Sequence, residues 1–190
     1  MTSIKGTQTE KNLLLSFAGE SQARNRYTFF ASRAKKDGYE HVAAVFEETA
    51  NQEKIHAQQF FSYLEGGPLE ITATYPAGAI LTTEKNLEGS AAGEYEEWHD
   101  IYPSFAKTAK DEGFIEVSKT FNAICVAEKQ HERRYRGFLE HLKAGDLFTR
   151  DNVIWRCRNC GFVSSATSAP GVCPACKVPQ AWFEILSENW

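Results

Sequence analysis

Long apolar runs are missing from this sequence. No stretch approaches the roughly 18 apolar residues that a membrane-spanning helix needs, and residues 1–6 have no apolar core like that of a signal peptide. A basic excess is missing too, since 21 Lys and Arg residues stand against 25 Asp and Glu residues, for a net charge of -4. We therefore expect no membrane span, no nucleic-acid partner and a cytoplasmic location. Aromatic residues make up 13% of the chain, which excludes a disordered protein.

Cysteine is almost absent outside one short segment near the C-terminal end. Four of the five cysteines form two C-x-x-C pairs, at Cys157 and Cys160 and at Cys173 and Cys176. In a reducing compartment, two such pairs are typical of a metal site rather than of disulfides. Four thiolates predict tetrahedral coordination, and zinc and a single iron fit it equally well. The remaining Cys125 is interpreted as a small apolar core residue.

Most of the chain has the pattern of long helices. Apolar residues recur at helical spacing, few of them β-branched, and Gly38, Gly113 and Gly145 each follow a helical segment. Residues 66–82 hold two prolines and three glycines without helical period, which predicts one long connection. Four long segments with one crossover indicate an all-α, ferritin-like four-helix bundle. The predicted segments are 9–37, 39–64, 83–112 and 114–144.

A second, smaller domain follows the bundle. Residues 146–152 are a polar linker, and the remainder is too short to fold without a staple, which a metal on the four cysteines would supply. We expect domains at 1–146 and 147–190. Gly161 follows the first cysteine pair and can adopt a left-handed backbone freely. Lys177 holds the same position after the second pair, where a left-handed backbone would cost about 1 kcal/mol. Aromatic side chains would shield the metal: Trp155, Phe162, Trp182 and Phe183.

The helical segments contain an internal repeat. Ala18-Gly19-Glu20 recurs as Ala92-Gly93-Glu94, 74 residues later, whereas Tyr27 and Tyr102 are 75 residues apart. One extra residue must therefore be absorbed in the third helix. This predicts a π-bulge between Glu94 and Pro103, a feature that often marks functional sites.

The repeat carries a pattern of carboxylates and histidines. Glu53-x-x-His56 recurs as Glu128-x-x-His131, and each follows a helix that carries a Glu, Glu20 or Glu94. Residues three apart share one helix face. One such motif alone could be a solvated face, but the full set is typical of dinuclear metal sites in bundles. Buried carboxylates would need the charge of two cations.

Three further residues are candidates beside this set. Glu97 lies three residues after Glu94 on the same face, so we interpret it as a seventh ligand rather than as surface charge. Tyr27 and Tyr102 follow Glu20 and Glu94 by seven and eight residues. Their hydroxyls could bind the ligand carboxylates, or the rings could simply pack in the core.

With both motifs in place, the whole chain resembles the rubrerythrin family. The resemblance rests on the bundle residues Glu20, Glu53, His56, Glu94, Glu97, Glu128 and His131 and on the cysteine pairs of a rubredoxin-like tail. It implies a diiron site in the bundle, one mononuclear iron on the four cysteines and a head-to-tail homodimer. It also implies catalytic roles for His56, Glu97, Tyr27 and Tyr102, with Glu97 exchanging for His56 at one iron on reduction.

The implied activity is a peroxidase that protects against oxidative stress. Hydrogen peroxide would be the substrate, and electrons would come from NAD(P)H through a reductase or rubredoxin and then through the tail iron. Two other readings stay open from the residues alone. One is a ferroxidase or iron-handling protein of the ferritin type, for which the tail would be superfluous. The other is an electron carrier or zinc-stapled binding module, which the paired Glu-x-x-His motifs disfavour.

Overall fold

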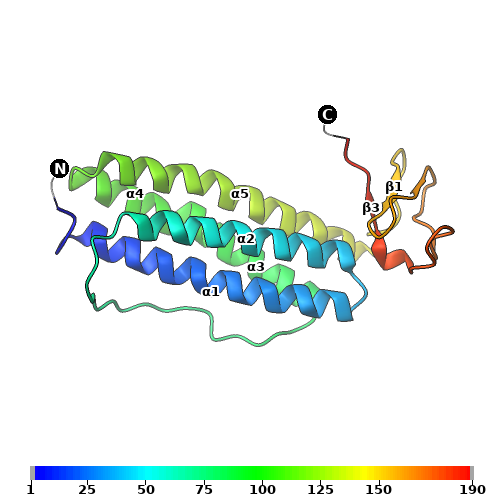
Figure 1. Ribbon diagram of the computed structural model, residues 1–190, viewed down its shortest axis with the longest axis horizontal. Helices are drawn as coiled ribbons and strands as arrows, with labels where there is room; N and C mark the ends of the chain where they lie inside the picture. The colour runs from blue at the N-terminus through cyan, green and yellow to red at the C-terminus, as the bar shows by residue number, and fades with distance from the viewer. Residues whose placement is uncertain (1–2, 189–190) are drawn as a thin grey trace.

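The helices form an elongated bundle with a small β-domain at one end (Figure 1). The structure is a computed structural model that describes residues 3–188. α1 packs mainly against α2, while α3, η1 and α4 follow one another as a nearly continuous rod along α5. The four-helix bundle expected from the sequence is confirmed. Its elements are α1 (Gln8–Lys36), α2 (Glu40–Ser62), α3 (Thr83–Glu96), η1 (Glu97–Ile101), α4 (Tyr102–Asp111) and α5 (Ile115–Ala144).

The two hairpins of the bundle turn in the same way. Gly38 and Gly113, 75 residues apart, both take left-handed backbone angles, with φ of 85° and 89°. Glycine adopts this conformation without steric cost. The residue after each glycine donates a backbone hydrogen bond to the carbonyl five residues before it. The sequence repeat is therefore also a structural repeat. The two bonds run from Tyr39 N to Ala34 O (2.8 Å) and from Phe114 N to Ala109 O (2.7 Å).

The third helix contains the predicted widened turn. Glu97–Ile101 is π-helical, between the α-helical segments that end at Glu96 and begin at Tyr102. The π-turn absorbs the one residue by which the repeat offset grows from 74 to 75. As a result, Glu94 before it and Tyr102 after it both lie in the buried interior, at 0% and 1% exposure.

The long connection between α2 and α3 runs along the outside of α1 (Figure 1). It spans the length of the bundle, so that α3 starts near the end of α1 and runs antiparallel to it. Tyr75 ties the connection to α1, because its hydroxyl donates a hydrogen bond to the Leu15 carbonyl at 2.7 Å.

The bundle has two apolar clusters with a polar layer between them. One cluster includes Tyr27, Phe46 and Leu139, toward the end where the β-domain lies. The other includes Leu13 and Phe60, toward the opposite end. On every long helix a buried glutamate falls between the two clusters. This layer is where the candidate metal ligands meet.

The β-domain is a three-stranded antiparallel sheet in the order β2-β1-β3. It contacts the start of α2, where His41 Nε2 lies 3.6 Å from a carboxylate oxygen of Glu184. Glu184 also accepts hydrogen bonds from Arg156 and Arg158 within the β-domain. The elements are β1 (Trp155–Cys157), β2 (Val163–Ser164), η2 (Gln180–Trp182) and β3 (Phe183–Ile185).

Within residues 3–188, no helix combines the length and apolar character needed to cross a membrane. The outer limits of the two expected domains, at residues 1–2 and 189–190, lie outside the described residues. The α-helices end at Ala144 and the first strand begins at Trp155, so the expected linker at 146–152 falls between the last helix and the sheet.

Candidate metal centres

Four glutamates from four different helices meet midway along the bundle. Glu20 lies on α1, Glu53 on α2, Glu94 on α3 and Glu128 on α5. Each is at most 1% exposed. A carboxyl group is buried in this way only where opposite charge is present or where it takes up a proton.

The two histidines divide these carboxylates into two groups. Nδ1 of His56 lies 2.8 Å from Glu128 Oε1, 3.0 Å from Glu53 Oε2 and 3.9 Å from Glu20 Oε1. On the other side, Nδ1 of His131 lies 2.7 Å from Glu128 Oε2 and 3.2 Å from Glu53 Oε1. Glu94 Oε2 completes this second group at 3.4 Å from the same nitrogen.

Glu53 and Glu128 therefore belong to both groups. Each turns one carboxylate oxygen toward His56 and the other toward His131. Within each group the four donor atoms lie within 4.8 Å of one another. A pair of adjacent cations bridged by two carboxylates would fit this arrangement, since bridging is a property of carboxylates that imidazole lacks.

The buried donor atoms have few hydrogen-bond partners of their own. Such atoms are costly unless a cation satisfies them, because each has lost its water. Their positions among the described residues fit two metal ions rather than a network of protein hydrogen bonds. In the described part of the chain, the buried donor atoms without a hydrogen-bond partner are Glu20 Oε2, Glu53 Oε1, Glu94 Oε2, both Glu128 carboxylate oxygens and His131 Nδ1.

The electrostatics point in the same direction. Burial, reinforced by neighbouring carboxylates, raises the pKa of Glu20 and Glu94 well above the ordinary value. Burial alone would lower the pKa of His56 and His131, but the nearby carboxylates of Glu128 and Glu53 raise these pKa values to about 10 and about 12. Without metal, protons on these histidines and glutamates would thus offset the negative charge of the site. Iron or a similar cation would replace them.

Two tyrosines support the carboxylates crosswise. The Tyr27 hydroxyl on α1 donates to Glu94 Oε1 on α3, and the Tyr102 hydroxyl on α4 donates to Glu20 Oε1 on α1, each at 2.5 Å. Burial and the adjacent carboxylates raise the pKa of both phenols well above 10, so both remain donors. The rings also pack in the two apolar clusters, so support of the carboxylates and core packing coexist.

Glu97 lies beside the two groups rather than within either of them. It is the first residue of the π-turn and is partly buried. Burial raises the pKa of its carboxyl group well above the ordinary value, and the charges of Glu94 and Glu128 raise it further. The structure thus brings six of the seven expected bundle residues together and leaves Glu97 adjacent.

Gln52 is a contributor that the sequence analysis missed. Its side-chain Oε1 lies 2.9 Å from Nε2 of His131, on the side of the ring away from the carboxylates. This contact favours the tautomer with the proton on Nε2, which leaves Nδ1 free to bind a metal. The repeat offers no signal for it, because the residue 75 positions later is Ala127.

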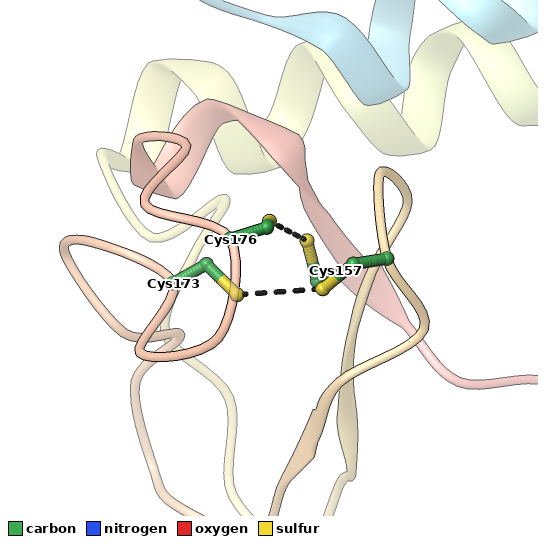
Figure 2. Close-up of side chains that lie close together, drawn as sticks. Cys157, Cys173 and Cys176 are labelled. Carbon is green, nitrogen blue, oxygen red and sulfur yellow. Dashed lines mark hydrogen bonds between the residues drawn. The ribbon is translucent and has the colours of Figure 1, made fainter.

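The four tail cysteines converge on one point. Figure 2 shows the side chains of Cys157, Cys173 and Cys176 turned toward a common space. The sulfur atoms of Cys157 and Cys176, and those of Cys160 and Cys173, are 3.7 Å apart. A tetrahedral site with metal–sulfur bonds of about 2.3 Å has edges of about 3.8 Å, so the cluster has the size of a tetrathiolate metal site.

The two cysteine loops share one backbone geometry. The amides of Gly161 and Lys177 donate to the carbonyls of Cys157 and Cys173, at 2.9 and 3.0 Å. Gly161 has φ of 81° and Lys177 has φ of 67°. The left-handed backbone anticipated at Lys177 is confirmed, and it is an unusual place for a side chain.

The remaining histidines and Cys125 lie outside both centres. His99 is half exposed and contacts Asp100, and His141 contacts Asp146. His41 contacts Glu184 of the β-domain, as described above. Cys125 is partly buried against the apolar cluster around Phe60.

Comparison with known proteins agrees with both centres. The family model described as Rubrerythrin matches residues 11–139, and that of the rubrerythrin rubredoxin-like domain matches residues 155–184. The rubrerythrin of Porphyromonas gingivalis is 58% identical over 189 residues, covering 99% of this chain and 94% of that protein. The rubrerythrin of Nitratidesulfovibrio vulgaris is 52% identical and covers both chains in full.

Solved structures extend the similarity to three dimensions. A mixed-valence nigerythrin structure superposes with a TM-score of 0.64 at 29% identity, covering 98% of this chain and 94% of that one. The reduced symerythrin of Cyanophora paradoxa superposes with the same TM-score at 25% identity, over 75% of this chain and 89% of that one.

Proposed function

The chain belongs to the rubrerythrin family, and on that premise we propose that it is a peroxidase that reduces hydrogen peroxide to water. Rubrerythrins are oxidoreductases with a diiron site and a rubredoxin-like iron domain, and both donor sets are present here. The observation that carries the proposal is the sharing of Glu53 and Glu128 between two adjacent groups. Two metals side by side suit a two-electron reaction at one O–O bond.

We assign the bundle ligands as Glu20, Glu53, His56, Glu94, Glu128 and His131, with Glu97 as the seventh. Iron at this paired site would supply one electron from each metal to the peroxide. The protein's part is to hold the donor atoms in place before the reaction. Tyr27 and Tyr102 fix the outer carboxylates, and Gln52 fixes the ring of His131.

Glu97 and His56 form the adaptable part of the site. His56 is 13% exposed at its side chain, whereas that of His131 is 2% exposed. Among residues 3–188 no hydrogen bond holds Nε2 of His56. We propose that His56 and Glu97 adjust to the oxidation state, while the His131 side of the site stays fixed.

The tail iron would act as the electron relay, and we propose that it serves a partner subunit. The β-domain contacts α2 at His41, twelve residues before Glu53, so it sits about 18 Å along the helix axis from the acidic layer of its own bundle. Electron transfer slows steeply with distance. A head-to-tail homodimer would bring each tail near the other subunit's site.

The electrons would originate from NAD(P)H and arrive through a reductase or a rubredoxin. Four closely spaced thiols require a reducing compartment, so we propose that the protein works in the cytoplasm. The domain limits that we propose for these roles are 1–146 for the diiron domain and 147–190 for the relay domain.

A peroxide assay with metal analysis tests the proposal. Purified protein with three irons per chain should consume hydrogen peroxide when a reductase, rubredoxin and NADH are supplied, and should form water without releasing oxygen. A zinc-filled tail, or iron uptake into a mineral without sustained peroxide consumption, would contradict it. The second result would identify a ferroxidase instead.

A further inference from the structure

A cavity of about 240 Å³ lies between the long connection and the bundle, next to the acidic layer. Its walls come from α1, from residues 72–75 of the connection and from the region of the π-turn. Glu97 and Tyr102 both line it. Tyr102 donates to the buried carboxylate of Glu20, so the inner end of the cavity borders the residues of the metal site.

Tyr75 forms part of the outer wall of this cavity. Tyr75 is 37% exposed, so it contacts solvent and also lines the cavity. The hydroxyl bond to the Leu15 carbonyl holds the ring against α1 across 60 residues of sequence. The ring therefore faces solvent and also lines the cavity that Glu97 lines.

The ring of Tyr75 approaches α1 at Gly19. A Cβ atom at this position would lie 3.7 Å from Cε1 of Tyr75, the nearest atom to it. The ring thus packs directly over the helix backbone, one residue before Glu20. This is ordinary van der Waals distance, so the ring lies against α1 at this point.

We propose that this cavity is the route by which peroxide reaches the metal site, and that Tyr75 determines how large a peroxide can pass. Hydrogen peroxide has only two non-hydrogen atoms and would pass beside the ring, whereas an aryl hydroperoxide would not. The inference rests on the proposed peroxidase function and adds a specificity-determining residue to it. Tyr75 acts through the width of the route and not through contact with the reacting atoms.

The first test compares substrates of different size. In iron-loaded Tyr75→Ala, the ratio of kcat/KM for cumene hydroperoxide to that for hydrogen peroxide should rise about tenfold or more. Tyr75→Leu should raise it less, and Tyr75→Phe should keep the low ratio, since it loses only the hydroxyl. Phe61→Ala is the matched control, because Phe61 is 56% exposed and packs on Phe17, away from this cavity.

The second test measures access without turnover. Formate and benzoate share a carboxylate head group and differ in size, and calorimetric titration of the oxidised iron-loaded protein measures their binding. Wild type and Tyr75→Phe should bind formate and exclude benzoate, and Tyr75→Ala should bind both. Tyr75→Leu provides the same comparison if the alanine variant does not fold.

The outcomes separate the two proposals. If wild type consumes no hydrogen peroxide, the proposed function fails, and the formate and benzoate titrations still test the route. If benzoate binds wild type as well as Tyr75→Ala, or if the substrate ratio is the same in all folded Tyr75 variants, Tyr75 does not set the width. The connection would then be only a brace on α1.

Discussion

Nε2 of His131 lies 2.9 Å from Oε1 of Gln52, and the residue that corresponds to Gln52 in the second repeat is Ala127. The two halves of the metal site therefore have the same kinds of ligand but differ in the contacts that orient the histidine rings. One histidine is fixed on both sides of its ring, and the other is fixed only toward the carboxylates. This difference leads to the first prediction.

Gln52→Ala should weaken metal binding at the bundle site by about 10–100-fold, because the ring of His131 loses the contact that orients it. Competition with a chelator, followed by metal analysis, measures the loss. The tail iron should be retained, and Gln58→Ala, an exposed change on the same helix, should behave as wild type. Equal metal retention in Gln52→Ala and wild type would remove Gln52 from the site.

Tyr27→Phe and Tyr102→Phe should each lower peroxide turnover by about tenfold or more, since each leaves a buried carboxylate without its donor. Tyr135→Phe is the control. Tyr135 is fully buried, and its ring lies 5.5 Å from that of Tyr27, but among residues 3–188 its hydroxyl has no hydrogen-bond partner. Steady-state kinetics on the three variants give the comparison. A loss in Tyr135→Phe equal to the others would mean that ring packing alone matters.

The metal-free bundle should lose stability as the pH rises from about 6 to about 10. The pKa values of His56 and His131 rise from 6.5 in the unfolded chain to about 10 and about 12 in the fold. A raised folded pKa contributes stability that is present below the unfolded pKa and is lost as the pH rises through the folded value. The raised pKa values of Glu20 and Glu94 act with the same sign, beginning at lower pH.

Thermal unfolding followed by helical circular dichroism measures this effect. The melting temperature of the metal-free protein should fall over this pH range, and that of the iron-loaded protein should fall much less, because metal replaces the protons. A melting temperature that rises with pH in the metal-free protein would contradict the charge arrangement described here.

Deleting His99 should turn the π-turn back into a regular α-helix. Glu94 and Tyr102 would then be spaced like Glu20 and Tyr27, so both should stay in the site. Glu97 should move to the position that Ala23 has in the first repeat, in an apolar cluster rather than beside the metal groups. Turnover should drop as far as in Glu97→Ala, with the helical content kept in both. His99→Ala is the control, since its side chain is 50% exposed. Wild-type turnover in the deletion variant would show that Glu97 and the π-turn are dispensable.

Much of this architecture could be predicted from the sequence because its cause is local. The helix period, the glycines that end segments and the 74-to-75 shift of the repeat determine the bundle and the π-turn. Gln52 and Tyr75 could not be found in this way. Each acts through one side-chain contact between elements far apart in sequence, 79 residues in the first case and 60 in the second. Neither position belongs to the motifs of the repeat.

The division of labour between the two centres is the central claim, and Cys160→Ser tests it most directly. Three thiolates and a hydroxyl are a poorer site for iron, so the tail should lose its metal or hold it weakly, while the bundle site should persist. Chemically reduced variant should still be oxidised by peroxide in a single turnover, and steady turnover driven by NAD(P)H, reductase and rubredoxin should fall sharply. Steady turnover at the wild-type rate would show that electrons enter the bundle directly, and the relay proposed for the tail would be wrong.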